Sequence, residues 1–345
     1  MNIVCLSTKG AGPRLTLDFA TIAKQNDPNI KIFVSSKNEL LAKFKDEFNT
    51  SQLNVVPINP NPLLAIVNRV FNGRIVFNRA LSEKFEGSNS IFFPMASMWD
   101  YYLSVAIREK YRIIRIIHDG VKHKGDMLQF NFMIKTQYRQ SDRVVCLSNF
   151  TANVLRRKFP KIETEIEISQ HPVFGFVKST TIDKSSHNYV LLLGRNKKYQ
   201  NFRRFIEFWE QDAELVANNT LVVAGRNVSH VQCKTNSVNF VDHWLSESEI
   251  SQLIANCQVA VFPYSEASQS GLIPIAKYFN KPIVFFPVGG LEEQVINYPL
   301  AEKAENFSEM MAILKNQQVR KIHSSSDNWK VTWKSLEYIV YKEVR

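Results

Sequence analysis

The sequence is poor in cysteine and lacks the cysteine patterns that hold metals or disulfide frameworks. Its four cysteines, Cys5, Cys146, Cys233 and Cys257, include no Cys-x-x-Cys pair. At least three of them lie in apolar runs, which predicts reduced thiols buried in the core. The chain also has no Asp-x-Asp pair and no His-Glu-x-x-His motif, so we expect no metal site and no metal cofactor.

Long apolar runs are missing as well. No stretch approaches the roughly 18 uncharged apolar residues of a spanning helix, so we expect no transmembrane segment. The chain opens on the strand-like run Ile3–Leu6, without a basic leader, and we expect a cytoplasmic protein. Glycine and proline number only 12 and 13, and 45% of the residues are hydrophobic, which excludes fibrous and disordered chains.

Acidic residues are fewer than basic ones, and the formal net charge is +11. Such an excess is typical of proteins that meet nucleic acid, an anionic membrane surface or a strongly anionic substrate. The basic residues are spread along the chain, and no zinc-finger or aromatic RNA-binding pattern accompanies them. We therefore expect no nucleic-acid partner and favour an anionic bilayer or an anionic lipid-linked substrate.

What is present is a regular alternation of short Val-, Ile- and Phe-rich runs with segments of helical periodicity, which is typical of parallel sheets covered by helices. A chain of 345 residues also exceeds the size that one hydrophobic core usually serves, which favours two domains. The first half contains strand-like runs at Ile3–Ser7, Ile30–Ser35, Leu53–Pro57, Ser90–Pro94, Ile113–Asp119, Arg143–Ser148 and Ile166–Gln170.

The alternation restarts after the polar stretch Lys178–Asn188, which we interpret as a linker. We expect an α/β protein of two Rossmann-like, doubly wound domains, 1–177 and 178–328, facing across a cleft at the carboxyl ends of their strands. A C-terminal helix over 329–345 can return to the first domain. The strand-like runs of the second half are Tyr189–Gly194, Thr220–Gly225, Val238–Val241, Gln258–Pro263 and Pro282–Pro287.

The segment Ser268-Gln269-Ser270-Gly271 follows one of these runs and opens a helix that continues through Tyr278. Ser268 or Ser270 is suited to cap that helix. A helix start at the carboxyl end of a parallel strand presents unpaired N–H groups and a positive dipole end, which suit a diphosphate. Taken alone, the segment is also consistent with a capped helix that binds nothing.

Further motifs surround this segment in a fixed order. Gly194-Arg195 ends one strand and Gly225-Arg226 another, a helix opens at Glu249, and Lys281-Pro282 and Gly289-Gly290-Leu291 follow the segment. In this order the second half closely resembles the nucleotide-sugar-binding domain of glycosyltransferase family 4. That family has the two-domain architecture called GT-B.

The resemblance implies a set of donor-binding residues. Arg195 stands at the family's Gly-Arg motif, where it would neutralise the donor diphosphate as the leaving nucleotide gains negative charge; the alternative is a surface arginine. The family's lysine five positions later is Gln200 here, and Lys197 or Lys198 would replace it. The implied donor contacts are Gly12, Arg195, Lys197, Lys198, Arg226, Tyr264, Ser268, Gln269, Ser270 and Gly271.

The segment departs from the family in its acidic residues. Family members commonly carry two glutamates eight positions apart, and here Ser268 and Ala276 occupy those positions, with Glu266 out of register. A subgroup whose motif reads Ser-Gln-Ser-Gly shares this loss. Activity is therefore still expected, while the base and the sugar of the donor stay open.

The first half contributes two further features. Gly10-Ala11-Gly12 is a short turn that can let backbone approach a ligand closely. His118-Asp119-Gly120 ends an apolar run, with His123 just beyond, and resembles the family's His-Asp-x-x-x-His-x-Gly run. The resemblance implies that His118 hydrogen-bonds the sugar or the acceptor and that Asp119 contacts the acceptor hydroxyl.

The expected catalytic residues are therefore His118, Asp119 and Arg195, with Gly10 and His123 on the acceptor side. A core histidine at 118 and a plain loop residue at 123 are the alternatives. The apolar residues from Leu63 to Phe71 repeat at helical spacing, and several arginines lie near them. A basic, apolar helix of this kind can lie on the inner membrane leaflet. Those arginines project in different directions, so packing on the helix's own sheet is favoured.

These observations predict a retaining, metal-independent hexosyltransferase of cell-surface polysaccharide biosynthesis. Its expected partners are a nucleoside-diphosphate-sugar donor of UDP or GDP type, a glycan or lipid-linked acceptor, and the anionic inner face of the membrane. No cofactor is expected besides the nucleotide-sugar substrate. Two alternatives stay open: a non-catalytic nucleotide-sugar-binding protein, and a GT-B nucleotide-sugar epimerase, against which the missing carboxylates count.

Overall fold

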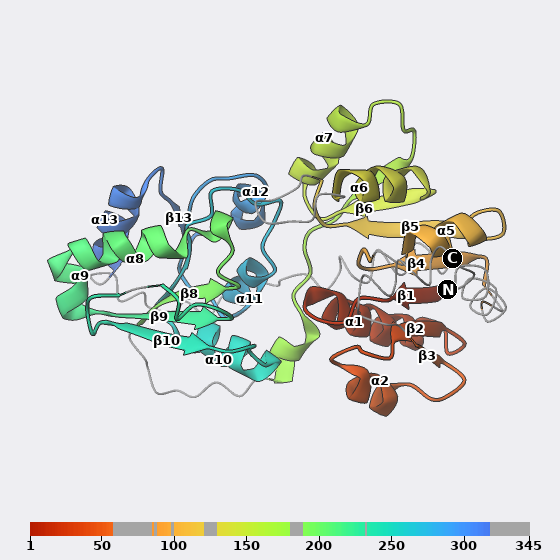
Figure 1. The fold of residues 1–345 in the computed structure, drawn as a ribbon, viewed down its shortest axis with the longest axis horizontal. Coiled ribbons are helices and arrows are strands. Elements are labelled where there is room, and N and C mark those ends of the chain that lie inside the picture. The colour runs from red at the N-terminus through yellow and green to blue at the C-terminus, as the bar shows by residue number, and fades with distance from the viewer. Residues whose placement is uncertain are drawn as a thin grey trace. The chain divides into compact units, whose positions relative to one another are not determined.

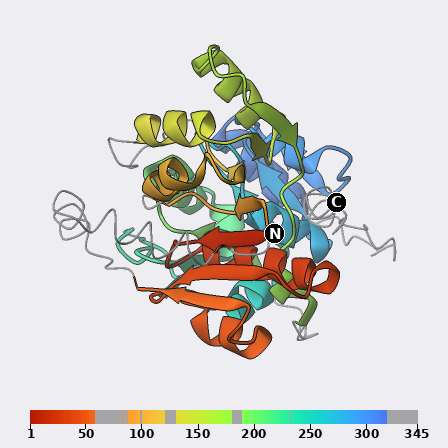
Figure 2. The same ribbon diagram turned by 90° about the vertical axis from the view of Figure 1, so that its right-hand side faces the viewer.

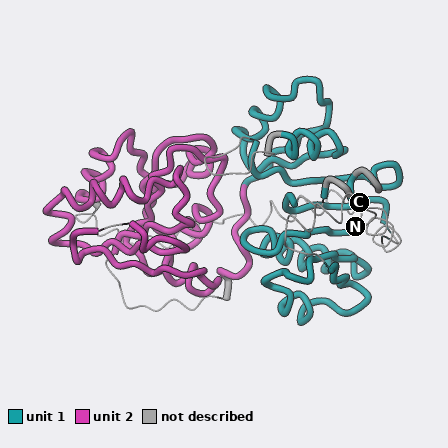
Figure 3. The backbone as a smooth tube through the Cα atoms, in the orientation of Figure 1, with its two compact units in different colours: residues 1–121, 127–170, 333–345 teal, residues 122–126, 171–332 magenta. Residues whose placement is uncertain are grey.

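The computed structural model describes residues 1–57, 85, 88–97, 100–120, 130–179, 189–231 and 233–317 of the protein. These residues form two compact units (Figure 3). Unit 1 comprises the described residues within Met1–Val121 and Met127–Gln170, and unit 2 those within His171–Thr332. Each unit has its own parallel sheet with helices packed on it (Figure 1).

Unit 1 contains a seven-stranded parallel sheet in the order β3-β2-β1-β4-β5-β6-β7. In Figure 2 the red and orange strands β1, β2 and β3 follow one another at one side of this sheet. The strands are β1 (Asn2–Cys5), β2 (Lys31–Ser35), β3 (Leu53–Val56), β4 (Ser90–Phe93), β5 (Arg112–Ile117), β6 (Arg143–Cys146) and β7 (Glu165–Ile168). The helices described in this unit are α1 (Ala11–Asn26), α2 (Leu41–Glu47), α5 (Asp100–Ile107), α6 (Phe130–Arg139) and α7 (Asn149–Lys158).

Unit 2 contains a six-stranded parallel sheet in the order β10-β9-β8-β11-β12-β13. Its strands are β8 (Tyr189–Gly194), β9 (Thr220–Gly225), β10 (Val238–Asp242), β11 (Val259–Phe262), β12 (Ile283–Phe285) and β13 (Ala301–Lys303). The helices described in this unit are η1 (Gly175–Ser179), η2 (Lys198–Gln200), α8 (Phe202–Gln211), α9 (Ala213–Asn218), α10 (Glu247–Asn256), α11 (Leu272–Tyr278), α12 (Leu291–Val295) and α13 (Phe307–Gln317).

Both sheets are doubly wound. The chain starts at an inner strand, builds the sheet outward on one side, and then crosses to the other side. The reversal falls between β1 and β4 in unit 1 and between β8 and β11 in unit 2. The expected α/β fold with two doubly wound parallel domains is thus confirmed, and ligands of such sheets bind beyond the carboxyl ends of the strands at this reversal.

Helix α8 shows how the sequence pattern builds the core of unit 2. Its apolar residues Phe202, Phe205, Ile206 and Trp209 recur at the spacing of one helix face, and all four are buried. They pack in one cluster with side chains of β8, β9 and α13. Burial of each such side chain contributes on the order of 1.5–3 kcal/mol. The cluster holds β8 and β9 against the helix.

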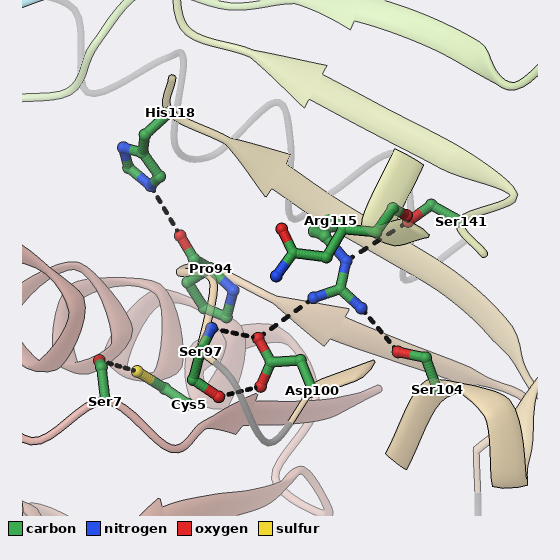
Figure 4. Close-up of polar contacts among 10 residues, drawn as sticks. Cys5, Ser7, Pro94, Ser97, Asp100, Ser104, Arg115, His118 and Ser141 are labelled. Carbon is green, nitrogen blue, oxygen red and sulfur yellow. Dashed lines mark hydrogen bonds and ion pairs between the residues drawn. The ribbon is translucent and has the colours of Figure 1, made fainter. Parts of the chain in front are cut away.

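The structure differs from the sequence expectations at two elements. Strand β13 was not expected, because its three residues are short of apolar character and lie at the sheet edge. The run that forms β5 was expected to be wholly apolar, yet Arg115 lies within it and is fully buried. Its guanidinium is paired with Asp100 in the interior (Figure 4).

Several expectations concern residues outside those that the structure describes. They are the site residue His123, the helix at 63–71 with its neighbouring arginines, most of the polar linker at 178–188, and the C-terminal helix at 329–345. These stay predictions. The four cysteines are all free, and Cys5, Cys146 and Cys257 are buried, as expected.

Candidate functional site

The reversal of strand order in unit 2 brings two predicted segments side by side. Strand β8 ends at Gly194 and leads into Arg195, while its neighbour β11 ends shortly before Tyr264 and the Ser268–Gly271 segment. Both therefore lie at the same edge of the sheet, next to the place where the strand order reverses. This edge is where a doubly wound sheet binds its ligand.

The loop after β8 is held by a buried glutamine. The Gln200 side chain is 6% exposed, and its Oε1 accepts hydrogen bonds from the backbone N–H groups of Arg195 and Lys197, both at 3.1 Å. The amide therefore fixes the backbone from which the two cations project. The exposed side chains of Arg195 and Lys198 and the half-buried side chain of Lys197 lie on this fixed loop. The residue in the place of the family's lysine thus supports the loop and adds no charge.

The same glutamine joins the β8 loop to the end of β11. Its Nε2 donates to the Tyr264 hydroxyl at 3.2 Å, and the Asn201 amide donates to the Pro263 carbonyl at 2.8 Å. Burial raises the pKa of Tyr264 to about 12, while its hydrogen bonds with Gln200 and Ser270 and the nearby charge of Arg195 act in the opposite direction. The tyrosine is therefore a neutral phenol at physiological pH. The structure thus brings together Arg195, Tyr264 and Ser270, which were predicted as donor contacts.

The start of α11 is arranged differently from the expectation. Its N-cap is Gly271, not a serine, and the cap makes no side-chain hydrogen bond. The Ser270 N–H, which was expected to be unpaired, donates to Gln294 Oε1 at 2.7 Å, and Gln294 Nε2 donates back to the Ser270 carbonyl at 3.0 Å. The Leu272 N–H points to Ser270 Oγ at 3.4 Å. Two backbone donors at this helix start are therefore already engaged, so fewer N–H groups are available to an anion here than the sequence predicts.

Gly271 packs closely against two rings of unit 2. A β-carbon at this position would lie 3.2 Å from the Phe174 ring and 3.5 Å from the His171 ring. Ser268 is fully buried, Ser270 is nearly so, and Gln269 is half-buried. The Ser268–Gly271 segment is consequently a packed and anchored loop whose shape is set by Gln294 and by these two aromatic rings.

The loop after β9 adds another cation at the same sheet edge. Arg226 is exposed and directly follows Gly225, which pairs with Gly194 across the two strands. Its neighbour Asn227 accepts a hydrogen bond at its carbonyl from the Asn196 amide at 2.6 Å. The loops after β8 and β9 are therefore tied together, with Arg195 and Arg226 on adjacent strands.

In unit 1 the predicted turn lies at the reversal between β1 and β4. Gly10 caps α1 with φ of 85°, a conformation that favours glycine, and its N–H donates to Glu39 Oε1 at 2.7 Å. Gly12 is buried in the first turn of α1, where a β-carbon would overlap the Ser7 hydroxyl and lie 3.0 Å from Met95. Packing against the ends of β1 and β4 thus accounts for the glycine at position 12.

His118 follows β5 and turns toward the end of β4 (Figure 4). Its Nε2 lies 2.9 Å from the Pro94 carbonyl oxygen. Because a carbonyl only accepts, Nε2 carries the proton and Nδ1 is the acceptor nitrogen. Burial lowers the pKa of His118, and the bond to Pro94 and the charge of Asp119 oppose this shift. The imidazole is therefore neutral near pH 7.

The predicted residues thus fall into two groups by unit. Arg195, Lys197, Lys198, Arg226, Tyr264 and the Ser268–Gly271 segment gather at the sheet edge of unit 2, and Gly10, Gly12, His118 and Asp119 belong to unit 1. Sequence reasoning missed the supporting roles of Gln200 and Gln294. Gln200 was noticed only as a departure from the family, and nothing in the local sequence marks Gln294, because its partner lies 24 positions away.

Among the described residues, no group of three or more His, Cys, Asp or Glu side chains is placed to hold a metal ion. No helix in the described part of the chain is both long and apolar enough to cross a membrane.

Comparison with known proteins finds the fold but no close relative. No protein-family model matches the sequence, and no curated protein matches it. Solved structures do match. The Anabaena protein Alr3699/HepE, in complex with UDP and glucose, is similar with a TM-score of 0.69 over 99% of this chain and 94% of its own, at 12% identity.

Two further structures are similar over nearly the whole chain. Sucrose-phosphate synthase from Thermosynechococcus elongatus has a TM-score of 0.65 over 100% of this chain and 94% of its own, at 12% identity. UDP-GlcNAc 2-epimerase from Methanocaldococcus jannaschii has a TM-score of 0.64 over 99% of each chain, at 11% identity. At such identities the likeness shows the fold alone, which is the one shared by GT-B glycosyltransferases and these epimerases.

Proposed function

We propose that the protein is a GT-B glycosyltransferase that binds a nucleoside-diphosphate sugar on unit 2 and transfers the sugar to an acceptor held by unit 1. The observation that carries the proposal is the cationic loop Arg195–Lys198, which Gln200 locks beside Tyr264 and Ser270 at the strand reversal of unit 2. Three of the similar structures, all of Anabaena Alr3699/HepE, are complexes with UDP, with UDP and glucose, or with UDP-glucose, which supports a nucleotide-sugar donor of UDP type.

The proposed task of this loop is to neutralise the negative charge of the leaving nucleoside diphosphate. When the glycosidic bond breaks, the bonding electron pair leaves with the nucleoside diphosphate, whose terminal phosphate oxygen gains negative charge. Arg195, with Lys197 or Lys198, supplies positive charge there, and Arg226 adds to it from the neighbouring strand. In this proposal the positive charges are on side chains whose backbone is already held in place. Little rearrangement of the protein is therefore needed as negative charge develops on the leaving group.

On the acceptor side, His118 is proposed to hydrogen-bond a hydroxyl of the sugar or of the acceptor. Asp119 is proposed to contact the acceptor hydroxyl. The proposal includes retention of anomeric configuration, transfer of a hexose without a metal, and a glycan or lipid-linked acceptor of cell-surface polysaccharide assembly. The acceptor class is favoured by the net charge of +11.

Donor binding is tested by thermal shift with UDP, GDP and dTDP, because a ligand that binds only the folded state stabilises it. One of these nucleotides is expected to raise Tm. Arg195→Ala should weaken its binding roughly 10- to 100-fold, the range that one charge-assisted hydrogen bond is worth. Arg203→Ala is the matched control, because that arginine is 82% exposed on α8 and pairs with Glu207. A wild-type protein that no nucleotide stabilises would contradict the proposal, and unchanged binding by Arg195→Ala would show that the diphosphate lies elsewhere.

Epimerisation of a nucleotide sugar is the second candidate, because one similar structure is a UDP-GlcNAc 2-epimerase. The two activities separate in one experiment. UDP-GlcNAc is incubated without an acceptor, and the products are resolved by chromatography. A change of the sugar at constant total nucleotide sugar identifies an epimerase, whereas a transferase needs an acceptor and releases UDP. Binding without a product in this reaction, and in a parallel one that contains a glycan acceptor, identifies a non-catalytic nucleotide-sugar-binding protein.

A further inference from the structure

Unit 1 contains a fully buried ion pair between β5 and the start of α5 (Figure 4). Arg115 and Asp100 are both 0% exposed, and Nη1 of the arginine lies 3.2 Å from Oδ2 of the aspartate. The other two guanidinium nitrogens also donate hydrogen bonds, Nη2 to Ser104 Oγ at 2.7 Å and Nε to Ser141 Oγ at 3.4 Å. The guanidinium carbon lies 4.2 Å from the centre of the Phe93 ring. Each of the three guanidinium nitrogens therefore has a hydrogen-bond partner.

A buried ion pair of this kind adds little to the stability of the fold. Removing two charges from water costs several kcal/mol per ion, and apolar residues of similar volume often replace a buried pair without loss. The contacts of Asp100 show what the pair does besides filling the core. Its carboxylate accepts hydrogen bonds from the Ser97 N–H at 2.6 Å and the Ser97 hydroxyl at 2.5 Å. Arg115 thus fixes Asp100, and Asp100 fixes the far end of the loop that follows β4.

The first residue of the same loop, Pro94, contacts His118. Pro94 directly follows β4, whose last residue Phe93 pairs with Arg115 in the sheet register. The Pro94 carbonyl accepts the hydrogen bond from His118 Nε2 at 2.9 Å. Met95 lies against the position of Gly12 at the start of α1. The Pro94–Ser97 loop is therefore the structural link between the buried pair, the histidine and the strand reversal of unit 1.

We propose that Arg115 and Asp100 are positioning residues for the sugar-transfer site. They hold the Pro94–Ser97 loop so that its Pro94 carbonyl fixes the orientation of the His118 imidazole and its Nε2–H tautomer. The assignment rests on the proposed function in so far as His118 meets the sugar or the acceptor. The geometry of the loop and the tautomer stand independently of that function.

The test removes both charges together, so that neither is left buried alone. In Asp100→Leu/Arg115→Met, Ser97 loses both acceptor contacts while the core stays filled. Nitrogen-15 spectra of histidine-labelled protein, with His118 identified by His118→Gln, report the tautomer directly. The wild type is expected to show one Nε2–H form and the double variant a mixture. In the transfer assay kcat should fall roughly 10- to 100-fold, the loss expected for a misplaced reacting group, while KM for the donor and the UDP thermal shift stay unchanged.

Two further variants keep the inference falsifiable. Ser104→Ala removes one guanidinium bond but leaves the contact between Asp100 and Ser97, and it should keep the wild-type tautomer and kcat. Ser97→Ala, at a half-buried position that does not threaten folding, removes one of the two loop contacts and should give a partial mixture. A double variant, or Ser97→Ala, with a single Nε2–H tautomer would overturn the positioning role. Absence of a thermal shift of the wild type with each of UDP, GDP and dTDP would instead refute the proposed function and leave the tautomer result decisive for the loop.

Discussion

Gly225 ends β9 with φ of 136°, where it faces Gly194 at the end of β8. A β-carbon at 225 would overlap the Gly194 carbonyl oxygen, so the position requires glycine for both its backbone angle and its contact. Gly225→Ala should therefore destabilise the protein by more than the roughly 1–3 kcal/mol of backbone strain alone.

Gly10→Ala is the matched control for that prediction. Gly10 also has positive φ, 85°, but a β-carbon there meets nothing within 4 Å. Urea unfolding of both variants separates strain from overlap. Equal losses of unfolding free energy would show that the contact with Gly194 has no part in the requirement.

His118 is expected to make stability depend on pH. Burial lowers its pKa below the ordinary value of 6.5, so the folded protein binds this proton less readily than the unfolded chain. Its contribution is therefore present above pH 6.5 and is lost as the pH falls toward the folded pKa. Urea unfolding at pH 7.5 and 5.5 should show a smaller loss of stability for His118→Gln than for the wild type. An identical loss in both proteins would assign the pH dependence to other groups.

At the scale of a single helix, α10 carries two serines with opposite expected effects. Ser246 caps the helix: its Oγ accepts from the Glu249 N–H, and Glu249 Oε2 accepts from the Ser246 N–H at 2.8 Å. Ser246→Ala should cost about 1 kcal/mol. Ser251 lies buried in the same helix, and its hydroxyl has no hydrogen-bond partner among the described residues.

Ser251→Ala should accordingly be neutral or stabilising, because it removes a buried hydroxyl that has no partner. Both variants are compared by their urea midpoints at constant m-value. A loss of stability by Ser251→Ala as large as that by Ser246→Ala would show that helix packing, and not the cap, sets the cost at both positions.

The elements themselves were largely predictable from the sequence. The limits of β8 and β9 agree to the residue with the expected runs, because both strands have an apolar interior and end at glycine. Strand β13 could not be predicted from the sequence, since Ala301–Lys303 has no apolar alternation and pairs only because β12 lies beside it. Arg115 was overlooked within β5, because its burial depends on Asp100, whose place follows from tertiary structure alone.

The candidate site was predictable in its position but not in its supports. Gly194-Arg195 and Ser268–Gly271 could be placed at neighbouring strand ends from the order of motifs and the topology. The engagement of the Ser270 N–H by Gln294 could not be foreseen, since a side chain of a later helix supplies the acceptor. For the same reason the sequence indicated only that Gln200 lacks the charge of the family's lysine, whereas its amide organises the loop.

At the scale of the whole molecule, the two units have separate sheets and separate apolar cores. Each also contains its own buried thiols, Cys5 and Cys146 in unit 1 and Cys257 in unit 2. Burial raises the pKa of Cys146 and of Cys257 to about 12 and raises that of Cys5 as well. In the folded protein these sulfurs are therefore both shielded and protonated, and they react only after the surrounding unit opens.

The rates at which these three thiols are alkylated report which unit opens first. In a Cys233→Ser background, pulses of iodoacetamide followed by peptide mass spectrometry would time the exposure of Cys257 separately from that of Cys5 and Cys146. UDP, which we propose binds to unit 2, should slow alkylation of Cys257 and leave the two thiols of unit 1 at their original rates. Equal slowing at all three sulfurs would mean that the two halves open as one cooperative body, and slowing confined to unit 1 would place the nucleotide there.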